Sequence, residues 1–117
     1  MANQKFLLIY RGPADNARTA PPSPAEMQQM YAAWGGWKEK FKANVLDIGD
    51  GLKPGGKVLA TGSVTDGPFA EAKEIVGGFS IISADSYERA VAVAKECPIV
   101  HMPGSKIEIR EMMGFTV

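Results

Sequence analysis

The run KFLLIYR over residues 5–11 decides the fold, because it is apolar on both faces of the strand that it would form. Strand alternation places residues 6, 8 and 10 on one face and residues 7, 9 and 11 on the other. Unbroken apolar runs of this length are typical of strands that are covered on both sides. We therefore predict that this run forms a central strand of the sheet.

Two helices are predicted from their start signals. The sequence Ser23-Pro-Ala-Glu26 combines an N-cap serine, a proline at the first helical position and a glutamate that can reach back to the cap amide. An apolar stripe follows to about residue 43 and is expected to face the sheet, although Gly35-Gly36 predicts an irregular helix there. The stripe consists of Met27, Met30, Tyr31, Trp34, Trp37 and Phe41. A second helix begins near Asp85-Ser86, and its apolar face places Cys97 in the core.

Further strands are predicted at residues 45–48, at 57–65 with a break at Gly62, at 75–83 and at 106–110. The order strand, helix, strands, helix, strand is that of an α+β, ferredoxin-like sandwich, in which two helices cover one face of an antiparallel sheet. With 117 residues, the chain is expected to form one domain, residues 1–117.

The predicted sheet has an apolar face that its own helices do not cover. Two helices cover one face only, yet the first strand is apolar on both, so a monomer would expose apolar surface to water. A second copy can cover this surface through a self-complementary two-fold contact. We therefore expect a homodimer.

Composition argues against several classes of function. Thirteen basic and thirteen acidic side chains leave no net charge, so neither nucleic acid nor an anionic membrane is an expected partner. The chain has one cysteine and one histidine, His101, and we expect neither a metal site nor a cofactor. It also has no long apolar run, and a cytoplasmic location is expected.

The loop TDGPFAEAKE, residues 65–74, holds the first candidate site residue. Asp66-Gly67 is a turn dipeptide and Pro68 stiffens the chain, so Asp66 is either a general base, a ligand-anchoring carboxylate or a turn-forming residue. Phe69 either fills the core or stacks on a ligand. Lys73 either borders a cleft or pairs with a neighbouring carboxylate in solvent.

Other candidate residues lie on the strands and the first helix. Arg11 and Arg110 suit an anionic ligand because guanidinium groups bind carboxylates and phosphates, although pairing with Glu108 or Asp66 would also satisfy them. Tyr10 presents a hydroxyl at a strand end. Trp34 either builds core or forms the wall of an aromatic pocket.

Several segments together resemble the DGPF branch of the YCII-related proteins. They are the early LLIY strand, the SPAEM helix start, the decapeptide at 65–74, the GGF triplet at 77–79 and the closing GSKIEIR at 104–110. The resemblance implies a ferredoxin-like protomer in a dimeric α/β barrel, an unassigned activity, and association of some members with sigma-factor-type regulators. More distant members are thought to pair a histidine with an aspartate. Here Asp66 matches the aspartate, whereas His101 could serve as its partner only if residues 98–105 fold over the cleft.

Three functions follow as hypotheses. The first is a small dimeric protein that binds a polar or aromatic metabolite in a cleft near Asp66. The second is a cofactor-independent enzyme of the isomerase, lyase or oxygenase type, with Asp66 as the general base. The third is a protein-interaction module that acts beside a sigma-factor-type regulator.

Overall fold

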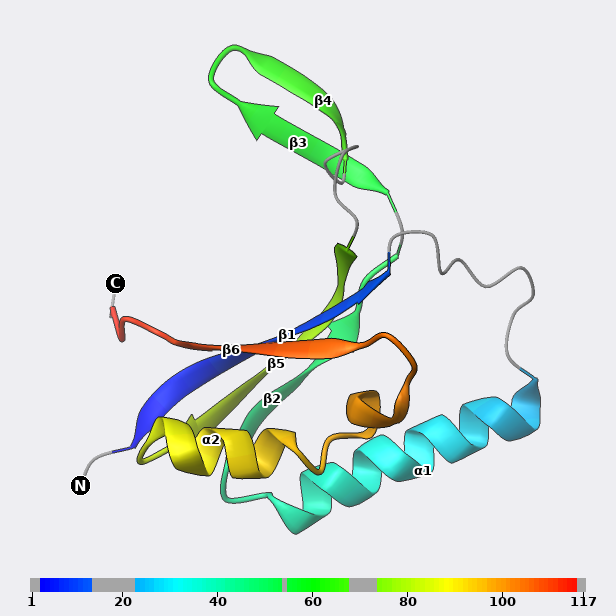
Figure 1. Cartoon of the computed structure of the whole chain (residues 1–117), viewed down its shortest axis with the longest axis vertical. Coiled ribbons are helices and arrows are strands. Elements are labelled where there is room, and N and C mark those ends of the chain that lie inside the picture. The colour runs from blue at the N-terminus through cyan, green and yellow to red at the C-terminus, as the bar shows by residue number, and fades with distance from the viewer. Residues whose placement is uncertain (1–2, 14–22, 54, 68–73, 116–117) are drawn as a thin grey trace.

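The computed structural model describes residues 3–13, 23–53, 55–67 and 74–115. Figure 1 shows a sheet with both α-helices on one side and a hairpin that projects from one end. In chain order the elements are β1 (Gln4–Pro13), α1 (Pro24–Lys40), β2 (Val45–Gly51), β3 (Gly56–Ala60), β4 (Ser63–Gly67), β5 (Glu74–Ala84), α2 (Tyr87–Ala94), the 3-10 helix η1 (Pro98–His101) and β6 (Lys106–Glu111).

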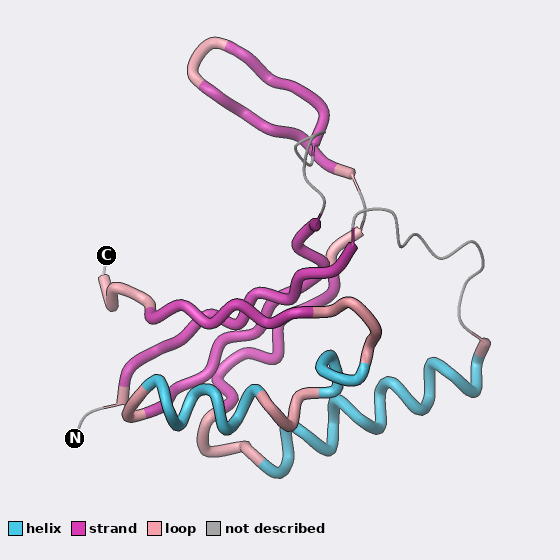
Figure 2. Tube along the Cα trace, in the orientation of Figure 1, coloured by secondary structure: helices cyan, strands magenta, loops and turns pink. Residues whose placement is uncertain are grey.

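Within the described residues, the main sheet has four strands in the order β2-β5-β1-β6, and β3 and β4 form a separate two-stranded sheet. All ladders of the main sheet are antiparallel. The prediction that residues 5–11 and 75–83 form central strands is therefore confirmed. The tube in Figure 2 shows the helices on one face of the antiparallel sheet, an α+β arrangement that is compatible with a ferredoxin-like fold.

The core lies between this sheet and α1 and α2. From the strands it takes Phe6, Leu8, Tyr10, Val45, Ile82 and Ala84, and from the helices and their ends Trp37, Phe41, Ala90, Val93, Ala94 and Cys97. The indole of Trp37 donates a hydrogen bond of 2.9 Å to the carbonyl of Val93, which joins the two helices. Cys97 is buried, as its position on the apolar face predicted.

Helix α1 begins as the sequence predicted but covers less of the sheet. The Ser23 hydroxyl accepts from the Glu26 amide, and the Glu26 carboxylate accepts from the Ser23 amide, forming a complete capping box. The stripe is buried only at Trp37 and at Phe41 beyond the helix, whereas its first turns extend past the core and leave their apolar side chains exposed. The helix is continuous through Gly35-Gly36, so the expected irregularity is absent.

Strand alternation gives the main sheet two different faces. Residues 6, 8 and 10 of β1 are buried under the helices, and residues 7, 9 and 11 lie on the opposite face, where they are half-buried. We call this second surface the outer face. It has an apolar centre of Leu7, Ile9, Phe79 and Ile81, which the register brings together from β1 and β5.

The hairpin β3–β4 is attached at the end of the sheet where β2 ends and β5 begins. Figure 1 shows it projecting away from the sheet on the side opposite the helices. From residue 55 to residue 66, every residue is exposed except Val58, which is half-buried. The hairpin is therefore an arm with little cover from the other described residues.

Candidate functional site

A cavity of about 670 Å³ lies at the end of the sheet that carries Tyr10, next to the first half of α1. Its lining is mostly aromatic and aliphatic, with Tyr10 from β1 and Tyr31 and Trp34 from α1. The β2 strand and its continuation, the start of β5 and the η1 region complete the wall. The other apolar residues that border it, with side chain or backbone, are Pro13, Met30, Ile48, Leu52, Ile75, Phe79, Ile99 and Met102.

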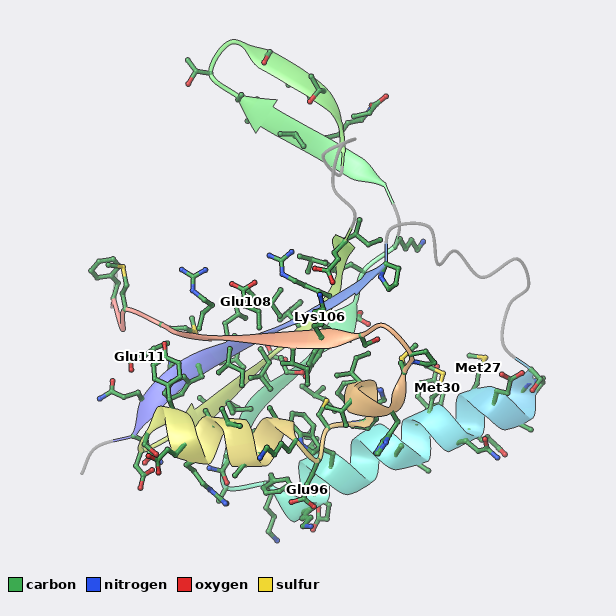
Figure 3. All side chains as sticks on the ribbon, in the orientation of Figure 1. Met27, Met30, Glu96, Lys106, Glu108 and Glu111 are labelled. Carbon is green, nitrogen blue, oxygen red and sulfur yellow. The ribbon has the colours of Figure 1, made fainter. Side chains whose placement is uncertain are left out.

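The overhang of α1 creates this cavity. Met30, Tyr31 and Trp34 recur at spacings of three and four, so they share one side of the helix. Trp34 is half-buried, with its ring centroid 5.6 Å from that of Tyr10 and 5.7 Å from that of Trp37. Figure 3 shows Met30 on the side of α1 toward the sheet. Of these three side chains Trp34 reaches the sheet, at Tyr10, whereas Met30 and Tyr31 stay exposed and form a wall instead of a packed core.

Two glycines allow the backbone to form the opposite wall. Gly49 has φ +72, and a Cβ there would lie 1.8 Å from the carbonyl oxygen of Phe79. A Cβ at Gly78 would lie 2.9 Å from the carbonyl oxygen of Asp50. Both positions therefore require glycine, because a side chain would force β2 and β5 apart. The β2–β5 register is irregular between Asp47 and Asp50, and this irregularity brings residues 48–52 to the cavity.

A chain of hydrogen bonds fixes the floor of the cavity at Tyr10. The Tyr10 hydroxyl donates to Ser80 Oγ at 2.7 Å, and Ser80 Oγ donates to the Ile48 carbonyl at 2.5 Å. The Cys97 thiol donates to the Tyr10 oxygen at 3.5 Å. Ser80 is fully buried, and its hydroxyl both accepts and donates within this network. Tyr10 is thereby held in one orientation.

The same network keeps its members uncharged. Burial raises the pKa of Tyr10 well above its usual range, although the hydrogen bond to Ser80 opposes the shift. Burial also raises the pKa of the Cys97 thiol. At neutral pH both groups are protonated, so Tyr10 is not a base and Cys97 is not a thiolate nucleophile.

Charged groups gather on the outer face, away from the cavity floor. Arg11 Nε donates to Glu108 Oε1 at 2.8 Å, and Arg110 donates to Glu108 Oε2 at 3.2 Å. These two hydrogen bonds, first that from Arg11, hold the pKa of Glu108 below its usual value. Figure 3 shows Glu108 on the side of the sheet away from the helices. Both arginines are thus partly satisfied by one carboxylate, which was the structural alternative for these residues.

The structure brings together some of the predicted site residues. Tyr10, Arg11 and Trp34 line the cavity, Arg11 at its edge. Arg110 belongs to the outer-face cluster instead. Phe69 and Lys73 lie outside the described residues.

The two residues predicted as catalytic are not part of the cavity lining. Asp66 lies on β4, where its carboxylate is 86% exposed and forms an ion pair with Lys57 across the hairpin. His101 is exposed at the end of η1. Within the described part of the chain, no hydrogen bond or ion pair joins Asp66 to His101, and their catalytic role stays a prediction.

Sequence reasoning missed the roles of Ser80, Asp50 and Gly49. Ser80 carried a usable signal, because it is a polar residue on the inward side of an otherwise apolar strand, where a buried hydroxyl requires a partner. Asp50 lies at the rim of the cavity, where its carboxylate accepts from the Gly51 amide at 2.8 Å. Its proximity to the cavity results from the irregular β2–β5 register, which local patterns do not predict.

No group of three or more histidine, cysteine, aspartate or glutamate side chains in the described ranges is placed to hold a metal ion. No helix in these same ranges is long and apolar enough to cross a membrane.

The fold and the cavity define a small α+β protein with an apolar recess between one end of its sheet and an overhanging helix. The family model of the YCII-related domain matches residues 7–116. The chain therefore belongs to the YCII-related domain family. Comparison with curated proteins found no match.

Proposed function

We propose that this protein binds a small aromatic or apolar molecule in the cavity between α1 and the sheet. The observation that carries the proposal is the cavity itself. Its volume of about 670 Å³ lies within the range of about 300–1,000 Å³ that is typical of small-molecule sites. Its lining is also typical, since it is mainly apolar with a few polar groups at defined positions.

The lining indicates what kind of ligand fits. The floor at Tyr10 offers little hydrogen bonding, because Tyr10 and Ser80 already bond to each other and to Ile48. The rings of Tyr10 and Trp34 favour a flat apolar group, which would stack or make edge contacts. Polar groups that border the cavity include Asp50 and Ser105. The matching ligand has an aromatic body that enters the cavity and a polar end that stays at the rim.

The cavity favours Tyr10 and Trp34, rather than Asp66, as the residues that bind the ligand. The ion pair of Asp66 with Lys57 on an exposed arm gives no support to a general base at this position. The TDGPFAEAKE segment supports placing the chain in the DGPF branch of its family.

A homodimer through the outer face is the second part of the proposal. The apolar centre of Leu7, Ile9, Phe79 and Ile81 lies opposite the helices, and no described helix covers it. A two-fold contact would bury this patch against its own copy. Two such sheets packed face to face would form the dimeric α/β barrel that the sequence led us to expect.

Ligand binding can be tested with a pair of matched variants. Met30 lines the cavity, whereas Met27, one turn earlier on α1, does not, and both side chains are similarly exposed. A thermal-shift screen of wild-type protein against small aromatic metabolites identifies a ligand, since binding at 100 times Kd stabilises the folded state by about 2.7 kcal/mol. Calorimetric titration then compares Met30→Ala with Met27→Ala.

Met30→Ala is expected to weaken binding of the hit by about tenfold, or ~1.4 kcal/mol, because it removes apolar contact with the ligand. Met27→Ala is expected to bind like wild type. If the two variants lose affinity equally, or if neither does, the ligand binds elsewhere. If no aromatic compound of the screen stabilises the folded protein, the proposed function is wrong.

A further inference from the structure

The arm formed by β3 and β4 has apolar side chains that nothing in the described chain covers. Leu59 and Val64 pair across the two strands and are 79% and 62% exposed. Lys57 and Asp66 pair on the same side of the hairpin, nearer its base, where their charges neutralise each other. An isolated two-stranded hairpin is at best marginally stable in water, so this arm requires a surface to pack against.

Among the described residues, the arm makes no extensive contact with the main sheet or the helices. The radius of gyration is 15.8 Å, whereas a compact domain of this length has about 13.4 Å. Figure 1 shows the arm rising on the side of the outer face, opposite the helices. A second copy that covers the outer face would therefore meet the arm.

A second exposed apolar patch lies at the other end of the sheet. Residues 112–115, which follow β6, carry no charged side chain, and Met113 and Phe115 are 83% and 80% exposed. The register separates this tail from the arm, because the end of β6 pairs with the start of β1, whereas the arm is attached where β1 ends. Figure 1 shows the tail and the arm at opposite ends of the sheet. The two patches of one chain therefore do not meet.

A two-fold axis perpendicular to the strands would bring these patches together. Such an axis reverses the strand direction, so the arm end of one sheet lies over the tail end of the other. Each dimer would contain this contact twice, which is the self-complementarity of a two-fold interface. Both surfaces are apolar and without net charge, so their burial leaves no charge unpaired.

We propose that the β3–β4 hairpin is a dimerisation arm that binds the C-terminal tail, residues 112–115, of a second copy of this chain. The arm contributes Leu59 and Val64, and the tail contributes Met113 and Phe115. This inference rests on the outer-face dimer of the proposed function, to which it adds the orientation of the two copies and a role for the arm. It is independent of the ligand.

Cross-linking tests the contact directly. The variant Val64→Cys/Met113→Cys carries one introduced thiol on the arm and one on the tail, and the two single variants are the controls. The native Cys97 is fully buried and stays out of reach of a short bis-maleimide reagent. The double variant is expected to give a covalent dimer on a denaturing gel, whereas each single variant is expected to stay largely monomeric there.

Sedimentation equilibrium of wild type, Leu59→Glu and Ala60→Glu gives the second readout. Ala60 lies next to Leu59 on the other side of the hairpin. Leu59→Glu is expected to raise the dimer dissociation constant by about tenfold or more, because it places a charge in an apolar contact, and Ala60→Glu is expected to change it little.

The outcomes separate the arm from the dimer itself. A wild-type protein that is monomeric at about 100 μM, far above the usual dissociation constants of stable dimers, overturns both proposals. A wild-type dimer that gives no arm-to-tail cross-link overturns the arm proposal and leaves the outer-face dimer intact. If Leu59→Glu leaves the dimer dissociation constant unchanged, the arm proposal is likewise wrong and the outer-face dimer stays intact.

Discussion

Replacement of Ser80 by alanine tests the hydrogen-bond network beneath the cavity. Ser80→Ala removes the acceptor of the Tyr10 hydroxyl and the donor to the Ile48 carbonyl, both at short distances in a fully buried place. Each buried group that loses its partner costs about 1–3 kcal/mol. The Ile48 carbonyl lies beside the cavity, where water can replace the lost donor, so its share is at the lower end. We expect Ser80→Ala to lower the free energy of unfolding by about 2–4 kcal/mol.

The assay is urea denaturation at one fixed protein concentration, with Ser83→Ala as the matched control. Ser83 is on the same strand but on the outer face, and its hydroxyl makes no hydrogen bond within the described residues. Its replacement is expected to change the stability by less than about 0.5 kcal/mol. The slope of the transition should be the same in all variants, which shows that they unfold between comparable states.

A double-mutant cycle with Tyr10→Phe isolates the bond between the two hydroxyls. Tyr10→Phe removes the donor that Ser80→Ala leaves without a partner, so the two losses should not add. The double variant is expected to be more stable than the sum of the single effects by about 1 kcal/mol or more. Additive effects, or a Ser80→Ala variant as stable as the Ser83→Ala control, would refute the reasoning.

Two further predictions concern glycines and pH. Nothing lies within 4 Å of a Cβ built at Gly36, so Gly36→Ala is expected to raise the free energy of unfolding by up to about 1 kcal/mol. Gly49→Ala is expected to destabilise the protein strongly, because the new Cβ would meet the Phe79 carbonyl. Thermal melts of both variants check these two predictions. Glu108 has a folded-state pKa below its usual 4.5, so its ion pairs add stability that is fully present above that pH and is lost as the pH falls through the lower value. Glu108→Gln should therefore lose less stability on acidification than wild type, and parallel acid-unfolding curves of the two proteins would contradict this.

The sequence predicted the main elements because their signals are local. The capping box at Ser23 and the alternation in β1 each depend on neighbouring residues, and the structure contains both. Alternation also divided the residues of β1 correctly between its two faces. These features depend on backbone geometry and periodicity, which one sequence contains.

The limits of α1 coverage could not be predicted in the same way. The apolar stripe from Met27 to Phe41 is uniform in sequence, yet only its end packs against the sheet. How far a helix overlaps a sheet depends on tertiary packing, which the periodicity of the helix sequence does not contain. The sequence pattern predicted that the whole stripe packs against the sheet. In the structure, its exposed half forms the cavity wall.

Sequence analysis identified some residues that line the cavity and one that does not. Tyr10 and Trp34 were identified from residue type and position, and the structure places both on the cavity. Asp66 was selected because a turn dipeptide holds it in a polar loop. The structure instead extends β4 through Asp66 as part of an exposed arm, a tertiary arrangement that depends on the whole hairpin.

The most direct test of ligand binding uses the two tryptophans as reporters in a ¹⁵N–¹H spectrum. Trp34 lines the cavity, whereas the indole N–H of Trp37 is bonded to the Val93 carbonyl in the core. A Trp34→Phe variant assigns the two indole signals. A ligand that stabilises the folded protein is predicted to shift the Trp34 signal more than the Trp37 signal, and the shift should reach half its maximum at a free ligand concentration equal to the calorimetric Kd. A stabilising ligand that leaves the Trp34 signal unchanged would show that the cavity is not the binding site.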